Sequence, residues 1–155
     1  MQTFMTQLYR GGEYLAGAAI CAMVVHIGLD VVALAIFERP LRGTTEVVSG
    51  LYMPFAVFGA LAAVQRARAE IRVDVINNLL SDAAQRRLDA VVQIAVALVA
   101  IALAWQTFDL AVRAYDLGEH IMIGIHKIPV WPGKAVIPIS FALLAVASLH
   151  RAVRP

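Results

Sequence analysis

The chain has 155 residues, of which 61% are hydrophobic and 15% are charged, and its formal net charge is +2. A soluble domain would have about 25% charged residues and a smaller apolar share, so the composition excludes an ordinary soluble globular protein. The small net charge gives no basis for nucleic-acid binding, and the single cysteine, Cys21, excludes a disulfide within the chain.

Four apolar runs are long enough to cross a hydrocarbon core of about 30 Å as helices. We therefore predict an all-α membrane protein in which residues 1–155 form a single membrane domain. It has four transmembrane helices and an amphipathic helix in the cytoplasmic interface, between the second and third spans. The expected spans are about 14–37, 45–64, 90–112 and 130–149, and the interfacial helix about 71–86.

The first span contains two polar side chains, His26 and Asp30, which lie four residues apart and so share one face of a helix. An ionisable residue inside a span is by default a candidate functional site, and a proton relay would use such a pair. We prefer a simpler interpretation, in which the pair makes a polar contact with another helix or Asp30 reaches the periplasmic interface.

The second span has a typical helix start, in which Thr44 or Thr45 caps the helix and Glu46 lies in the first turn. We expect Glu46 to stabilise this start and to contact a partner chain, in preference to binding an ion. Pro54 in the middle of the span is expected to bend the helix, which neighbouring helices tolerate in membranes.

Small residues indicate where helices approach closely. Gly59 and Ala63 form a small-xxx-small pair, and replacing Gly59 with leucine is expected to weaken assembly with a partner. The third span has an alanine stripe, which together with Trp105 we interpret as packing. Its alanines are Ala95, Ala97, Ala100, Ala102 and Ala104.

A basic elbow follows the second span and contains Arg66, Arg68, Arg72 and Asp74. Juxtamembrane arginines bind phospholipid headgroups and set topology, and we favour this over binding of an anionic substrate. With four spans, the side that holds both termini has eight Lys and Arg residues and the other side has five. The positive-inside rule then places both termini in the cytoplasm.

The segment from about 115 to 133 is expected to be an outer loop, with Trp131 as an anchor at the headgroup level. His120 and His126 in this loop, with Glu119, form a weak candidate metal site because their spacing is irregular. Asp109 and Arg113 are spaced for an ion pair within one helix.

The pattern resembles the small membrane subunit (DctQ-type) of tripartite ATP-independent periplasmic, or TRAP, transporters. The matching features are Thr45-Glu46 at the second span, the apolar run 55–63, the elbow ending in Ile71-Arg72-Val73-Asp74, and Ile128-Pro129-Val130-Trp131 with Ile137-Pro138 at the fourth span. Four spans in a chain of this length also match.

The resemblance implies a non-enzymatic subunit of a secondary transporter for organic acids such as dicarboxylates, in a bacterial inner membrane. A periplasmic binding protein delivers the substrate, and a large multi-span subunit holds the substrate and sodium sites. The small subunit packs against the scaffold of that large subunit. No cofactor or metal is expected in the small subunit itself.

Three other classes fit the composition. A small proton-coupled multidrug exporter has four helices and an essential glutamate, and here Glu13 lies only at the edge of the first span. A haem-binding redox subunit needs two facing histidines at depth, where only His26 is found. The small subunit of a tripartite tricarboxylate transporter also has four spans, and only its partners would distinguish it.

Overall fold

The computed structural model describes residues 2–66, 82–123 and 125–153. Among these residues, four helical segments are long and apolar enough to cross a membrane, which confirms the predicted all-α membrane fold with four spans. The elements are α1 (Gln2–Phe37), α2 (Thr44–Val47), the π-helical turn η1 (Val48–Tyr52), α3 (Met53–Arg66), α4 (Asp82–Asp116), β1 (His120–Ile123), β2 (His126–Pro129) and α5 (Trp131–Val153).

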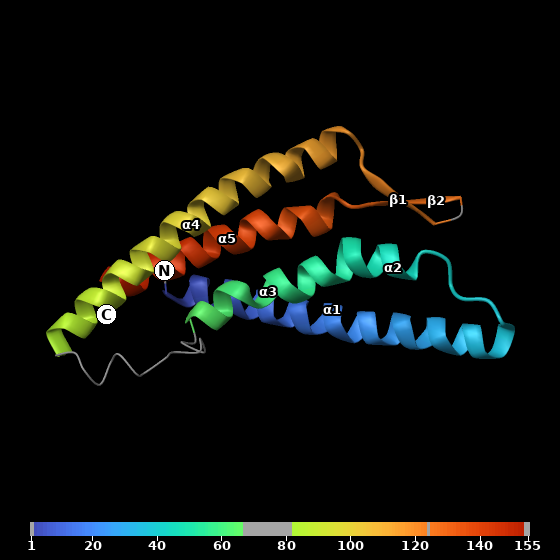
Figure 1. Ribbon diagram of the computed structural model, residues 1–155, viewed down its shortest axis with the longest axis horizontal. Coiled ribbons are helices and arrows are strands. Elements are labelled where there is room, and N and C mark those ends of the chain that lie inside the picture. The colour runs from blue at the N-terminus through green and yellow to red at the C-terminus, as the bar shows by residue number, and fades with distance from the viewer. Residues whose placement is uncertain (1, 67–81, 124, 154–155) are drawn as a thin grey trace.

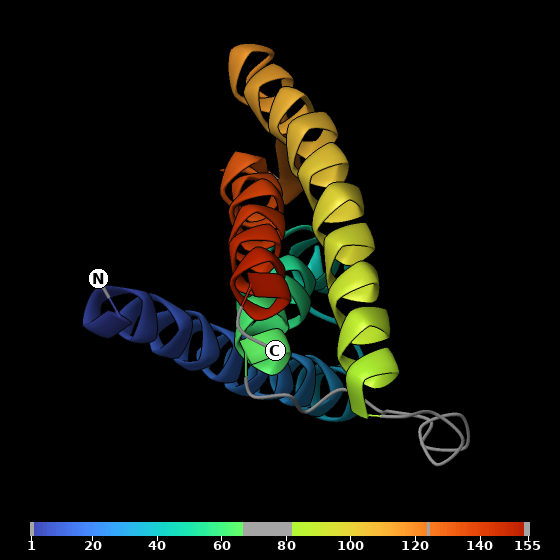
Figure 2. The ribbon, with the colours of Figure 1, turned by 90° about the vertical axis from the view of Figure 1, so that its left-hand side faces the viewer.

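The long helices lie side by side in the order α4, α5, α3, α1 (Figure 1). α5 and α3 are the inner members of this row, and α4 and α1 are its edges. Figure 2 shows the N-terminal end of α1 pointing away from α4 and α5. Each edge helix therefore has one main neighbour within the chain, and most of its apolar surface is left exposed.

Both chain termini lie at one end of the row, and the β-hairpin lies at the other end (Figure 1). We call these the termini end and the hairpin end. The antiparallel hairpin was not expected from the sequence, which predicted an irregular loop there. The expected interfacial helix at 71–86 falls largely outside the described residues, although residues 82–86 form the start of α4.

The second span contains a π-helical turn, η1, which ends two residues before Pro54. Proline has no N–H, so Pro54 cannot make the bond that a regular α-helix would direct to the Gly50 carbonyl. The wider turn accommodates this, because the N–H of Met53 donates to the carbonyl of Val48, five residues back. The sequence predicted a bend at Pro54, and the feature that the structure shows there is this π turn.

Glycines let this second span approach both of its neighbours backbone to backbone. A Cβ atom on Gly12 of α1 would lie 2.2 Å from the carbonyl oxygen of Gly59 in α3. A Cβ atom on Gly133 of α5 would lie 2.2 Å from the carbonyl oxygen of Gly50 in η1. Both distances are far below a van der Waals contact, so each crossing requires a glycine.

α4 packs against α5 through small side chains. Its buried residues are Gln93, Ala97, Ala100, Ala111 and Ala114. They recur three and four residues apart, with half-buried positions 104 and 107 in between, as in the seam of a coiled coil. The alanine stripe is therefore only partly a packing surface, since Ala95 and Ala102 are exposed.

The end of α1 offers a test of backbone strain. Glu38 directly follows the helix with φ = 57°, a left-handed conformation that costs an L-residue about 1–2 kcal/mol. We expect Glu38→Gly to raise the free energy of unfolding in mixed detergent micelles by about 1 kcal/mol. Glu38→Ala is the control, because it removes the carboxylate and keeps the strain. Equal stability of the two variants would contradict this explanation.

Candidate functional site

His26 connects α1 to the π turn. Its Nδ1 atom lies 3.3 Å from the hydroxyl oxygen of Tyr52, the last residue of η1. The two rings meet edge to face, with centroids 5.8 Å apart and planes at 71°. Which of the two groups donates depends on the histidine tautomer. The contact agrees with our preferred interpretation, in which His26 makes a polar contact with another helix.

Asp30 has a different partner, the loop between α1 and α2. Its Oδ1 atom accepts a hydrogen bond of 2.6 Å from the N–H of Leu41. The hydroxyl of Thr44 in turn donates to the carbonyl of Leu41 at 3.3 Å. Asp30 therefore holds this loop at the hairpin end.

The expected threonine cap of the second span is wrong. The N-cap residue is Gly43, with φ = 81°, and no side chain caps the helix. Thr44 is already the first helical residue, and the first helical bond runs from the N–H of Val47 to the carbonyl of Gly43. Glu46 lies in the first turn, as predicted, and its side chain is exposed.

Gly43 and Gly50 make room for the hairpin. A Cβ atom at Gly43 would lie 2.6 Å from Cγ1 of Ile123, and one at Gly50 would lie 2.7 Å from Cδ1 of Ile121. Both isoleucines are on β1, two residues apart and so on the same face. The hairpin is thus positioned by apolar contacts with the start of α2 and with η1.

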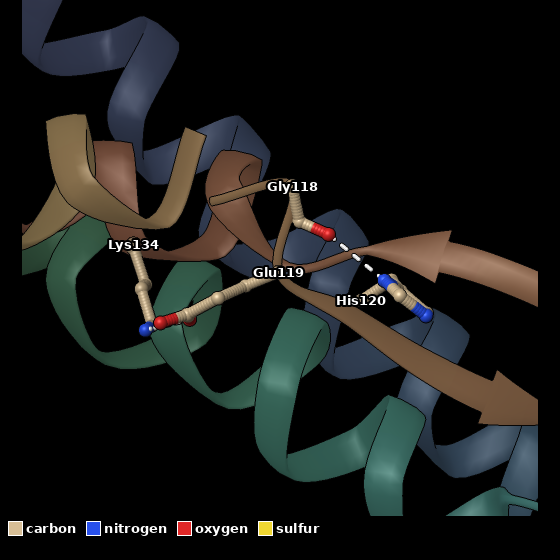
Figure 3. Close-up of polar contacts among 4 residues, drawn as sticks. All are labelled: Gly118, Glu119, His120 and Lys134. Atoms are coloured by element: carbon tan, nitrogen blue, oxygen red, sulfur yellow. Dashed lines mark hydrogen bonds and ion pairs between the residues drawn. The ribbon is translucent and has the colours of Figure 1, made fainter. Parts of the chain in front are cut away.

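The base of the hairpin is fixed by Glu119 (Figure 3). Its carboxylate pairs with the ammonium group of Lys134 in the first turn of α5, and its carbonyl accepts a bond of 3.1 Å from the N–H of Val130. Gly118, with φ = 59°, ends α4, and its carbonyl oxygen lies 2.8 Å from Nδ1 of His120. These contacts join the ends of α4 and α5.

The candidate metal site is not assembled. In the hairpin, His120 is opposite Pro129 and His126 is opposite Ile123, so the two histidines lie at different ends of the strands. Glu119 is already paired with Lys134. In the part of the chain that the structure describes, no three His, Cys, Asp or Glu residues are grouped to hold a metal ion.

The pair between Glu119 and Lys134 is expected to contribute modestly, because each side chain is 40% exposed. Replacement of either partner by a neutral residue (Glu119→Gln or Lys134→Met) is expected to lower stability by less than about 1 kcal/mol. The exchange Glu119→Lys with Lys134→Glu should recover most of that loss. A double-mutant cycle in mixed micelles measures the coupling, and a double variant less stable than both single variants would contradict the pairing.

Aromatic side chains and a second ion pair lie near the hairpin end. Trp131 begins α5 and packs edge to face against Tyr115 of α4, with ring centroids 5.7 Å apart. Trp131 is partly exposed, and its role as an interface anchor stays a prediction. The predicted pair of Asp109 and Arg113 is confirmed, with 2.8 Å between Oδ2 and an Nη atom.

The remaining predicted site residues are placed as follows. Gly59 packs within the chain, where a Cβ atom would lie 3.0 Å from the carbonyl oxygen of Gly12. Arg66 is the last residue of α3, and the other elbow residues, Arg68, Arg72 and Asp74, lie outside the described residues.

The sequence interpretation took Trp105 as a packing residue in preference to part of a ligand site. Within this chain Trp105 is 80% exposed. It lines an apolar groove between α4 and α5 that sequence reasoning missed. The signal was present, because Ile101, Trp105 and Phe108 recur at the spacing of one helix face.

Comparison with known proteins gives one match. The family model described as "Tripartite ATP-independent periplasmic transporters, DctQ component" matches residues 23–155. This range includes the second part of α1, from residue 23 onward, and all of the other elements. No curated protein and no solved structure matches the chain.

Proposed function

We propose that this chain is the non-catalytic small membrane subunit of a TRAP transporter, because it belongs to the DctQ family of TRAP transporter components. In this role it scaffolds a large membrane subunit, and a periplasmic binding protein delivers the substrate. The transported solutes would be organic acids such as dicarboxylates, and the sodium sites would lie in the large subunit.

The arrangement of the helices in one row is the observation that best supports a scaffolding role. α1 and α4 each present a long apolar surface, on which residues such as Val24 and Trp105 are mostly exposed. The polar pair of the first span, His26 and Asp30, is engaged in contacts within the chain. Such a row offers broad faces for lipid and for a second membrane protein.

We further propose that the chain lies in a bacterial inner membrane with both termini in the cytoplasm. The two termini lie at the same end of the row, and the sequence has eight basic residues on that side and five on the other. In this orientation Arg66, Arg68 and Arg72 bind phospholipid headgroups at the inner leaflet. The hairpin faces the periplasm, where the binding protein would approach.

Co-purification tests the proposed function. The affinity-tagged chain is expressed with the large membrane subunit and the binding protein from the same bacterium, and the complex is isolated in a mild detergent. We expect the large subunit to be recovered with the tagged chain in a fixed ratio. Recovery of the tagged chain without the large subunit, under conditions that keep both folded, would contradict the proposal.

A further inference from the structure

An apolar groove runs along one side of the α4–α5 pair, with a volume of about 750 Å³. Its walls come from these two helices, and at the hairpin end Tyr115 and Trp131 border it. α5 is an inner helix of the row, and its exposed residues from Ile139 to Leu149 all line this groove. The groove is therefore the uncovered face of this stretch of α5.

The wall residues recur with the spacing that favours an additional helix. On α4 they are Ile101, Trp105, Phe108, Val112 and Tyr115, at alternating steps of four and three. On α5, residues Ile139, Ala142, Val146 and Leu149 follow the same alternation. A 3.5-residue repeat on two neighbouring helices is the pattern into which a third helix packs its side chains as knobs.

The length of the groove also matches a helix. It extends from Trp131 to Leu149 on α5, which is about 27 Å at a rise of about 1.5 Å per residue. The hydrocarbon core is about 30 Å thick, so the groove spans nearly all of it. A single lipid chain reaches only through one leaflet and would fill about half of this length.

The charges around the groove favour a helix over a phospholipid. No residue that lines it is charged, so the occupant must be uncharged at these depths. Two basic residues flank its hairpin end, Lys134 and Arg113, and these are paired with Glu119 and Asp109. A lipid phosphate held at this mouth would have to compete with both carboxylates for its cations.

We propose that this groove receives one uncharged transmembrane helix of the large membrane subunit. The assignment rests on the proposed function and adds to it which face of the chain is the docking surface. Small residues such as Ala135 and Ala142 let the incoming helix approach closely, and Trp105 and Phe108 cover its flank.

Site-specific photocrosslinking tests this proposal in the assembled complex. A photoreactive phenylalanine derivative replaces Trp105, which lines the groove, or Leu103, which is exposed on the same helix and does not line it. We expect irradiation to join the large subunit to the chain from position 105. We expect at least a tenfold lower yield from position 103, since a helix in the groove contacts one flank of α4.

Filling the groove gives a second test. Ala142→Phe places a ring in the groove, whereas Ala102→Phe places the same ring on an exposed part of α4 outside it. Overpacking costs about 1–3 kcal/mol, which corresponds to about a 5- to 150-fold loss. We expect Ala142→Phe to reduce recovery of the large subunit by at least fivefold, and Ala102→Phe to leave it unchanged.

The outcomes separate this proposal from the proposed function. If the large subunit co-purifies and is crosslinked from 103 but not from 105, the docking face is wrong and the scaffolding role stands. Crosslinks from 105 only to lipid, or only to a second copy of this chain, would overturn the proposal in the same way. If the unmodified chain does not recover the large subunit at all, the proposed function fails, and the docking surface fails with it.

Discussion

Replacing Gly133 with alanine is expected to separate α5 from the π turn and to lower the free energy of unfolding by about 3 kcal/mol. The new Cβ atom would lie 2.2 Å from the carbonyl oxygen of Gly50. That atom belongs to the backbone, so no side-chain rotation relieves the overlap. The helices themselves must move apart, and unfolding in mixed detergent micelles measures the loss.

Gly28→Ala is the matched control for this variant. Gly28 is on α1, and a Cβ atom there would meet nothing within 4 Å. Alanine has a higher helix propensity than glycine, so this change is expected to be neutral or to stabilise by up to about 1 kcal/mol. If Gly133→Ala is as stable as Gly28→Ala, then α5 and η1 do not meet at their backbones.

Replacing Gly12 with alanine is expected to detach α1 from α3, with a loss of about 1–3 kcal/mol. Its Cβ atom would lie 2.2 Å from the carbonyl oxygen of Gly59. α3 is the main neighbour of α1 within the chain, so a loss of this contact removes most of the packing of α1. Gly59→Ala is expected to cost less, because its nearest contact, the carbonyl oxygen of Gly12, would be 3.0 Å away.

The adjacent residue gives a control for this series. Gly11 is in the same turn of α1, and a Cβ atom there would have no neighbour within 4 Å. The expected order of destabilisation is therefore Gly12→Ala, then Gly59→Ala, then Gly11→Ala, measured as free energies of unfolding. Equal effects at positions 11 and 12 would show that α1 does not cross α3 at Gly59.

The sequence predicted the four spans because apolar length and the bilayer thickness determine them with little tertiary information. It also indicated Gly59 as a close helix contact. What it did not reveal is the partner of Gly59. A small residue permits close approach by any helix, and here that helix is α1 of the same chain.

The hairpin was missed for a different reason. Its strands have four residues each, and glycine and proline around them favoured an irregular loop. The strands are positioned by Ile121 and Ile123 against Gly50 and Gly43, which are about 70 to 80 residues earlier in the chain. Contacts of this range leave no periodic signal in a short segment.

The exposure of Trp105 shows a related limit. Periodicity placed it on one face of the third span, but apolar faces toward lipid, toward the chain and toward a partner have the same composition in a membrane. Only the arrangement of α4 on α5 shows that Trp105 lines a groove and that the buried face consists of residues such as Ala97 and Ala100.

Uptake into proteoliposomes tests the central claim most directly, namely that this chain functions as a scaffold and carries no solute itself. Vesicles containing this chain, the large subunit or both are supplied with the periplasmic binding protein, a labelled organic acid and a sodium gradient. We expect uptake only in vesicles that contain both membrane subunits. Uptake by vesicles that contain this chain alone would contradict the account.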